Sequence, residues 1–252
     1  MKGKTEAEIE SMREGGKITS ETLRNVAKAI KVGTTLIELD TIARDTIAHN
    51  NAIPSFLGYR DYPAVLCISV NDGVVHGIPT SYKIREGDVV SIDLGVFYQG
   101  FHTDLSQSYI AGNQPENVDY LRKKTFLAVG EQALANALNV ARAGNRIGDI
   151  SHAIEQVITK AGYSIIRELT GHGVGRKLHE NPFIPGFGAP HTGDYLLSGQ
   201  TLAIEVIYAE KNPAIKTLSD GWTIVTRDHS LGGLFERTVV IKENGCEILT
   251  LV

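Results

Sequence analysis

The sequence predicts an α/β domain of helices and antiparallel strands, arranged in two halves of similar order. Three observations lead to this prediction. Apolar residues recur at helical spacing in four long segments. Apolar runs bounded by turn residues predict strands between and after those segments. The segment 33–40 (GTTLIELD) also aligns with the segment 144–151 (GNRIGDIS), and each opens a helical pattern.

The first half is predicted to hold two helices followed by a hairpin-rich set of strands. The helices are expected at about 6–31 and at 36–49. Pro54 and Gly58 open an aromatic-rich loop, after which strands are expected at 64–70, 88–98 and 101–110. Gln99-Gly100 would form the tight turn between the last two strands.

The second half repeats this order. Helices are expected at 121–143 and 147–160, and strands near 165–168, 200–208, 222–226 and 234–242. No low-complexity or Pro/Gly/Ser-rich linker separates the halves. We therefore expect one domain over 1–252 with a pseudo-two-fold, its halves covering about 1–115 and 116–252. Chance similarity between two helix starts is the alternative explanation of the repeat.

Composition excludes several classes of protein. Lys and Arg number 25 against 29 Asp and Glu, and the net charge of -4 argues against a direct nucleic-acid partner or adsorption to a membrane surface. No apolar run approaches the roughly 20 residues that span a bilayer. The charged N-terminus is unlike a signal segment, and two cysteines make neither a disulfide framework nor a thiolate zinc cluster. We expect a soluble, cytoplasmic protein.

Four acidic residues interrupt strands that are otherwise apolar. Asp93 and Asp104 lie on the two arms of the predicted hairpin, nearly opposite each other, and Glu205 and Glu236 lie in two later strands. Like charges across a strand pair are destabilising, and burial makes this worse unless a cation or proton intervenes. A solvated hairpin face, or an ion pair with Arg237, is the alternative for a single acid. Together the acids indicate a site for divalent metal, with more than one ion.

Histidines supply a second signal. His172 and His179 lie in the glycine-rich segment 171–182 (GHGVGRKLHENP), which we expect to be a non-repetitive loop. Neutral imidazole is a common ligand of transition metals. Either histidine alone could belong to a helix-capping loop, and His76 alone is more typical of a structural histidine. Cys67, in an apolar strand, is expected to be a packing residue.

The ordered set Asp93, Asp104, His172, Glu205 and Glu236 resembles the five-ligand dinuclear centre of the methionine aminopeptidase and prolidase superfamily. The resemblance covers essentially the whole chain and is strongest to type I methionine aminopeptidases. It implies the pita-bread fold, in which helices lie outside a curved antiparallel sheet with an internal pseudo-two-fold.

The resemblance also implies a role for each matching position. Asp104 and Glu236 would bridge two metal ions, Asp93 would chelate one, and His172 with Glu205 would complete the other. The oxygen-rich set with one histidine suits Co, Mn, Fe or Zn. Three residues would act on the substrate: His76 near the scissile amide, His179 near its carbonyl, and Glu205 as the proton shuttle. The pocket for the N-terminal side chain would be lined by Phe56, Tyr59, Tyr62, Cys67 and Trp222.

The activity implied is metal-dependent removal of the N-terminal methionine from peptides and nascent proteins, by a monomer associated with ribosomes. One alternative is an Xaa-Pro aminopeptidase or dipeptidase, against which the lack of an N-terminal creatinase-like domain argues. The other is a non-catalytic pita-bread protein that binds peptides or ribosomes. Proteins of that kind usually lose metal ligands, whereas this chain keeps all five.

The chain departs from its relatives at a few positions around these ligands. Phe56 stands where a small residue is usual, Leu178 replaces a frequent Phe, and Arg60 stands where His is common. Val206 and Arg237, which directly follow Glu205 and Glu236, replace a usual Pro and a usual His. We expect these departures to alter the shape of the pocket and the substrate preference more than the chemistry.

Overall fold

The computed structural model describes residues 3–252. Its helices are α1 (Glu6–Lys28), α2 (Leu36–His49), α3 (Val118–Val140), α4 (Ile147–Lys160) and the short 3₁₀ helix η1 (Tyr59–Asp61). Thr5 and Thr35 begin α1 and α2 with capping boxes that include Glu8 and Glu38. Asn117 caps α3 and sets its start three residues earlier than the apolar pattern predicts, and the helix also ends three residues earlier. No helix among the described residues is long and apolar enough to cross a membrane.

Most strands belong to one antiparallel sheet of ten strands with the central order β1-β4-β5-β12-β9-β7-β8. Strands β2, β6 and β13 pair with β4, β9 and β12, and β10-β11-β3 form a separate small sheet. The strands are β1 (Ile53–Pro54), β2 (Leu66–Val70), β3 (Gly73–Val75), β4 (Val89–Tyr98), β5 (Phe101–Ile110), β6 (Ser164–Ile165), β7 (Thr170–Gly173), β8 (Glu180–Pro185), β9 (Thr201–Ala209), β10 (Ile215–Thr217), β11 (Ile224–Thr226), β12 (Gly232–Lys242) and β13 (Gly245–Ile248).

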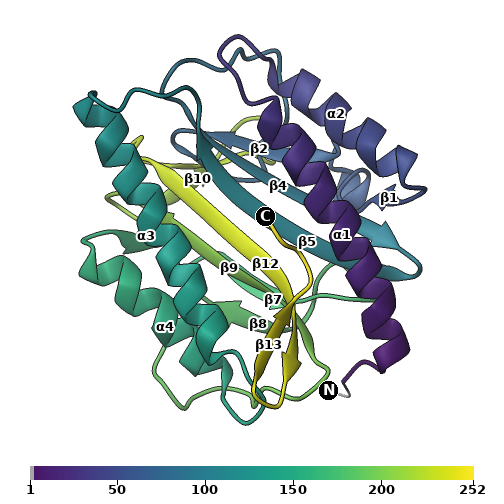
Figure 1. Cartoon of the computed structure of the whole chain (residues 1–252). Helices are drawn as coiled ribbons and strands as arrows, with labels where there is room; N and C mark the ends of the chain where they lie inside the picture. The colour runs from purple at the N-terminus through teal and green to yellow at the C-terminus, as the bar shows by residue number, and fades with distance from the viewer. Residues whose placement is uncertain (1–2) are drawn as a thin grey trace.

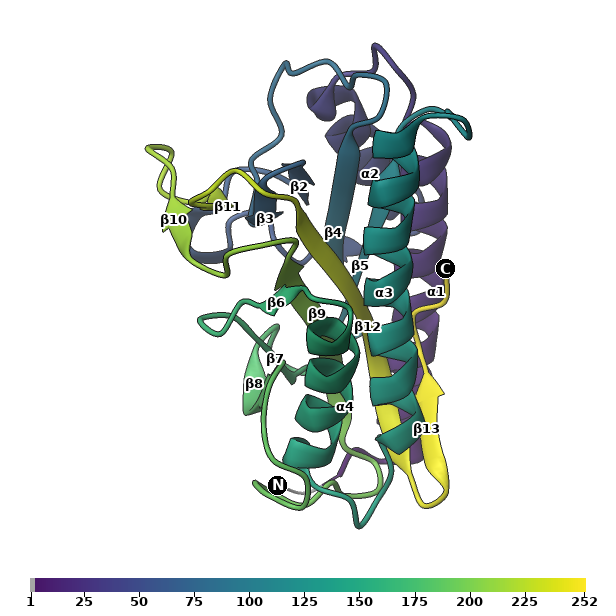
Figure 2. The same ribbon diagram turned by 90° about the vertical axis from the view of Figure 1, so that its left-hand side faces the viewer.

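The helices cover one face of the large sheet, and the small sheet lies on the opposite side (Figures 1 and 2). The period of two along each strand assigns its residues to these faces. Ile92 and Leu94 of β4 pack in a core with residues of α1 and α2, and Ile204 of β9 and Phe235 of β12 pack with α3 and α4. The residues between them, among which are the strand acids, therefore point away from the helices.

The glycine-rich segment around His172 is a strand rather than the predicted loop. Gly171, His172 and Gly173 lie in β7, which pairs with both β8 and β9. A Cβ at Gly171 would lie 2.6 Å from the carbonyl oxygen of Ala203, and one at Gly173 would lie 2.3 Å from that of Asn181. These glycines allow close approach of neighbouring strands, which explains the composition that suggested a loop.

Other strands were misplaced by the sequence pattern. The strand expected at 165–168 is confined to β6, and β8 was not expected because Pro182 and Pro185 interrupt it. The short strands β1, β3, β10 and β13 were also not predicted. These elements have two to four residues, too few for a clear alternating pattern.

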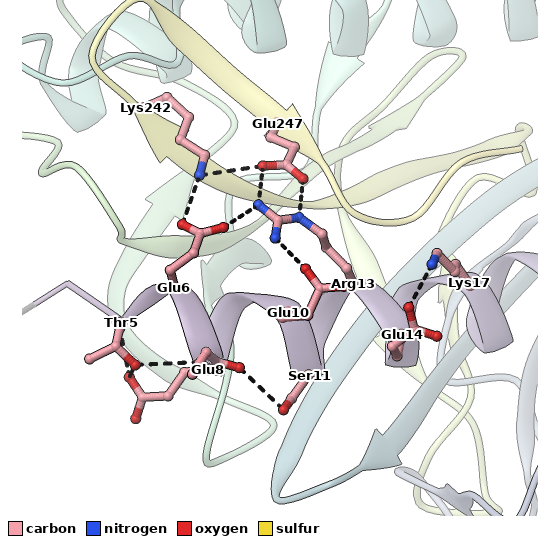
Figure 3. Close-up of polar contacts among 11 residues, drawn as sticks. Thr5, Glu6, Glu8, Glu10, Ser11, Arg13, Glu14, Lys17, Lys242 and Glu247 are labelled. Atoms are coloured by element: carbon pink, nitrogen blue, oxygen red, sulfur yellow. Dashed lines mark hydrogen bonds and ion pairs between the residues drawn. The ribbon is translucent and has the colours of Figure 1, made fainter.

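A network of ion pairs connects the N-terminal helix α1 to the C-terminal hairpin of β12 and β13 (Figure 3). Arg13 of α1 contacts Glu247 of β13 through Nε and Nη2, at 2.5 and 2.9 Å. It also pairs with Glu10 at 2.6 Å and with Glu6 at 2.7 Å. Lys242 of β12 lies 3.4 Å from Glu247 and 3.8 Å from Glu6. The network links segments at opposite ends of the chain.

Candidate metal centre and its cavity

Three of the strand acids and a serine form one row across four neighbouring strands. Asp93 on β4 lies opposite Ser106 on β5. Ser106 lies opposite Glu236 on β12, and Glu236 lies opposite Glu205 on β9. Residues directly opposite each other point to the same face of a sheet, so all of these side chains face away from the helices.

Asp104 and His172 join this row from adjacent positions on the same face. Asp104 precedes Ser106 by two residues and lies opposite Gly95. The two hairpin aspartates are therefore diagonal neighbours. The sequence predicted that they lie nearly opposite each other, and the observed pairing differs from this by two residues. His172 on β7 lies opposite Ala203, two residues before Glu205. The sheet thus brings together all five predicted metal ligands.

The donor atoms of this cluster lie close enough to share metal ions. Asp104, His172 and Glu236 are buried, and each offers one ligand atom within 4.8 Å of the others. Glu205 approaches the group through His172, with 3.5 Å between Oε1 and Nε2. One imidazole among carboxylates is a donor set that suits first-row transition metals.

The carboxylates lack the partners that buried charges need. Among the described residues, Asp93 Oδ1 and Glu236 Oε1 are buried without a hydrogen-bond partner, although Ser106 donates to the other oxygen of Glu236 at 2.7 Å. Burial raises the pKa of Asp93 to about 7 and that of Glu236 to about 8. Burial and the neighbouring acids raise the pKa values of Asp104 and Glu205 as well. Bound cations would supply the missing counter-charge, so the residues present fit a metal centre.

His172 is held in the tautomer that a metal ligand requires. Its Nδ1 lies 2.9 Å from the carbonyl oxygen of Gly173. A carbonyl oxygen only accepts, so Nδ1 carries the proton and Nε2 presents a lone pair toward Glu205. Burial lowers the pKa of His172, which also favours the neutral imidazole.

A cavity of about 400 Å³ opens over this cluster. It is lined by every residue predicted to bind metal, act on the substrate or form the side-chain pocket: Phe56, Tyr59, Tyr62, Cys67, His76, Asp93, Asp104, His172, His179, Glu205, Trp222 and Glu236. The structure therefore brings together residues from six strands, from η1 and from connecting loops. The roles assigned to them individually remain predictions.

One end of the cavity is buried and apolar. Phe56, Tyr62, Cys67 and Leu178 belong to one buried cluster there, with Trp222 packed against it. Cys67 lies opposite Asp93 in the β2–β4 pair, so its thiol lies between the apolar end and the acids. The hydroxyl of Tyr62 does not point into the cavity. It donates to the backbone carbonyl oxygen of Leu66 or of Gly77, each 2.9 Å away.

His179 lies toward the open side of the cavity. Its Nδ1 is 2.9 Å from the hydroxyl of Tyr59, and its ring centroid is 4.3 Å from that of His172. Desolvation of the ring against the cavity wall, reinforced by repulsion from His172 and His76, lowers the pKa of His179 to about 3, although part of the residue is exposed at the opening. The imidazole is therefore neutral at physiological pH, and Tyr59 fixes its orientation.

His76 is held in the cavity wall by a backbone that a non-glycine residue rarely adopts, with φ at 58°. The next residue anchors this conformation. The carbonyl oxygen of Gly77 accepts from the amide of Ile68 at 2.8 Å and lies 2.9 Å from the Tyr62 hydroxyl. The His76 ring stands edge-on to Trp222, with 6.3 Å between centroids, and burial lowers its pKa.

The departures from the family pattern occupy two different places. Phe56, Leu178 and Arg60 line the cavity. Val206 and Arg237 instead point toward the helices, where Val206 is in the core and Arg237 donates to the side chain of Gln107 at 2.9 Å. These two residues therefore do not shape the cavity directly.

The sequence did not single out Ser106 of the acid row, nor several residues of the cavity lining, among them Val75, Glu168, Leu169, Thr170 and Phe183. Ser106 hydrogen-bonds Glu236 within the acid row, and its position two residues after Asp104 was the available signal. Phe183 of β8 lines the cavity although it is exposed. Strand β8, which carries Phe183, was not predicted because prolines lie on either side of this residue.

Comparison with known proteins supports this description. The chain is 44% identical over 249 residues to the methionine aminopeptidase of Clostridium perfringens, covering 99% of this chain and 98% of that protein. The crystal structure of methionine aminopeptidase from Thermotoga maritima has a TM-score of 0.95 and 41% identity, with 100% of both chains covered.

A more distant structure shows the same fold. Prolidase from Pyrococcus furiosus has a TM-score of 0.78 at 23% identity, with 99% of this chain and 65% of that chain covered. These likenesses confirm the predicted pita-bread fold. Residues 10–243 match metallopeptidase family M24, and with relatives this similar over almost the whole chain, the protein belongs to that family.

Proposed function

We propose that this protein is a metal-dependent aminopeptidase that removes the N-terminal methionine from peptides and newly made proteins. Two observations support the proposal. Relatives that cover nearly the whole chain are methionine aminopeptidases. The cavity combines a cluster of acids with a buried apolar end, which are the two parts that recognition of a methionine N-terminus needs.

The buried end of the cavity would take the methionine side chain. Phe56, Cys67 and Leu178 offer an apolar surface to a flexible thioether, which adapts well to irregular cavities. The free α-amino group would then lie directly beside the acid cluster, because Cys67 at this end lies opposite Asp93. Because the apolar end is closed, only one substrate residue would fit between it and the scissile bond. The protein would therefore cleave only the first peptide bond, as an exopeptidase does.

The acid cluster would hold two divalent ions, Co, Mn, Fe or Zn. Asp104 and Glu236 would bridge them, Asp93 would bind one, and His172 with Glu205 would bind the other. When bound, such ions lower the pKa of water and polarise a carbonyl group. The unpartnered oxygens of Asp93 and Glu236 are the observation that most favours this assignment.

Side chains of the protein would carry out the proton transfers and stabilise the developing charge. Glu205 would accept a proton from the attacking water and return it to the leaving amine. His179, oriented by Tyr59, would donate to the carbonyl oxygen through Nε2 as negative charge grows there. His76 would contact the scissile amide from the opposite wall.

The proposed substrates also suggest a setting. Polypeptides that still carry their initiator methionine are those leaving the ribosome. We therefore extend the proposal to a cytoplasmic monomer that acts near ribosomes.

A peptide panel tests the proposal. Metal-stripped protein is titrated with Mn, Co, Fe or Zn and assayed on Met-Ala-Ser, Leu-Ala-Ser and Ala-Pro-Ser. The proposal requires metal-dependent release of methionine from the first peptide at the highest rate. Preferential cleavage of Ala-Pro-Ser would indicate an Xaa-Pro peptidase, and cleavage of none of them with any metal would indicate a binding protein.

A further inference from the structure

The cavity has an open side formed by a few exposed residues. The exposed residues of its lining are Arg60, Glu168, His179 and Phe183, whereas the apolar end is buried. A peptide whose first side chain fills the apolar end must leave the cavity past these residues.

Phe183 connects this opening to a second hollow. The hollow has a volume of about 620 Å³ and is lined in part by Asn181, Pro182, Phe183, Pro185, Phe187 and Asp194. We call it the β8 groove. Phe183 is 62% exposed and is the one described residue that lines both the cavity and the β8 groove. The two hollows are therefore adjacent, with an aromatic ring between them.

The groove also runs beside a strand edge. Strand β8 ends the sheet order and pairs only with β7 among the described strands, and Figure 2 shows it at the rim beside α4. Extended peptides commonly bind along such edges. Pro182 and Pro185 lack amide hydrogens, so contacts there would come from side chains and carbonyl oxygens rather than from a full β ladder.

We propose that the β8 groove binds the substrate residues that follow the scissile bond. The inference rests on the proposed aminopeptidase function and extends its substrate from a first residue to a longer extended chain. The proline and phenylalanine rings would pack against apolar parts of that chain. Asp194 is the one charged residue among the described lining residues, so it would favour a basic over an acidic residue there.

Peptide length separates the groove from the cavity. An extended chain advances by roughly 3.3–3.6 Å per residue, so five added residues reach about 17 Å further. A tripeptide held by its N-terminus would contact little of the groove, whereas an octapeptide would enter it.

The test compares kcat/KM for Met-Ala-Ser with that for octapeptides that begin with the same three residues. We expect wild-type protein to prefer the octapeptides. In Phe183→Ser, the octapeptide-to-tripeptide ratio should fall by roughly three- to tenfold, as expected for loss of one aromatic contact. Val118→Ser, at an 82% exposed position on α3, is the matched control and should leave the ratio unchanged.

A charge exchange provides a second, independent readout. Octapeptides with Lys or Glu at the fifth position are compared in wild type and in Asp194→Lys. Preference for the Lys peptide should reverse in the variant. Equal use of short and long peptides by wild type, or an unchanged ratio in Phe183→Ser with no reversal in Asp194→Lys, would overturn the inference. Failure of wild type to release methionine from any peptide would instead overturn the proposed function.

Discussion

Glu205 on β9 and Glu236 on β12 lie directly opposite each other in the sheet, on the face that points away from the helices. Two carboxylates in this relationship repel each other, and the pKa of Glu205 is raised by burial and by Glu236. The sequence therefore places like charges together at a position where only protons or cations can make them compatible. We therefore expect metal bound at this pair to stabilise the folded protein.

The first prediction concerns the stability of the metal-free protein. Its buried carboxyls have pKa values above those of the unfolded chain, about 7 for Asp93 and about 8 for Glu236. Above about pH 7, where histidines are largely neutral in both states, the folded state binds more protons than the unfolded state, so the free energy of unfolding should fall as pH rises. Below that pH the lowered pKa values of His76, His172 and His179 act in the opposite direction. Each unit of pKa shift corresponds to about 1.4 kcal/mol.

Urea unfolding in the presence of EDTA at pH 7 and at pH 8 measures this effect. Glu236→Gln is the comparison variant and should show a flatter dependence on pH, because it removes one shifted carboxyl. A metal-free protein that is more stable at pH 8 than at pH 7 would show that the acids are compensated by something other than protons or cations.

The second prediction separates His179 from the metal ligands. His179→Ala should retain bound metal while kcat falls by about 10²–10³, the usual cost of losing one donor to a developing oxyanion. Tyr59→Phe keeps the ring but removes the hydroxyl 2.9 Å from Nδ1, so a smaller loss is expected. Metal analysis beside steady-state kinetics checks both variants. Loss of metal from His179→Ala, with full activity per metal retained, would show that the residue is a ligand.

The third prediction concerns the apolar end of the cavity. Phe56 and Leu178 share one buried cluster, and the family resemblance predicts that Phe56 is enlarged and Leu178 reduced relative to the usual residues. Phe56→Cys alone should enlarge the pocket and raise relative activity on larger N-terminal residues. Apolar pockets discriminate by about 1–3 kcal/mol per methylene, so a several-fold change in the methionine-to-leucine ratio is expected.

The double variant Phe56→Cys/Leu178→Phe serves as its control. If the two positions compensate in volume, the double variant should restore selectivity for methionine. An unchanged methionine-to-leucine ratio in Phe56→Cys would mean that this ring only packs the loop.

The sequence predicted the long elements well because their patterns repeat over many residues. The α2 and α4 helices and the β5 strand have the expected bounds, and the capping boxes and apolar spacing explain why. His172 was placed in a loop because its glycines, which let β8 and β9 approach, also resemble turn residues. Local composition does not distinguish these two uses of glycine.

The site was predictable in its members but not in its arrangement. An acid within an apolar strand, such as Asp93, is conspicuous in the sequence, and the family resemblance brought in His76 and Trp222. The register that places Ser106 between Asp93 and Glu236 depends on how distant strands pair. The hydroxyl of Tyr62, which reaches backbone rather than substrate, could not be anticipated either. The predicted pseudo-two-fold stays a prediction.

The fourth prediction concerns the charge network between α1 and the C-terminal hairpin (Figure 3). Arg13 lowers the pKa of Glu247, so the network stabilises the folded state at neutral pH, and this contribution is lost in acid. Arg13→Ala should lower the free energy of unfolding by about 1 kcal/mol, or about 2–4 °C in Tm. Lys17→Ala, which breaks a single exposed pair with Glu14, should have a smaller effect. Equal effects of the two substitutions in thermal denaturation would contradict a cooperative network.

The most direct test of the account is metal content and methionine release measured together on wild type and Glu236→Gln. Both proteins are stripped of metal, reloaded with Mn or Co, and assayed on Met-Ala-Ser. We predict that wild type binds two ions per chain and releases methionine only when loaded, whereas Glu236→Gln binds fewer ions and is inactive. Full methionine release by metal-free wild type, or a full complement of metal and activity in Glu236→Gln, would contradict the central claim that this acid cluster is the catalytic metal centre.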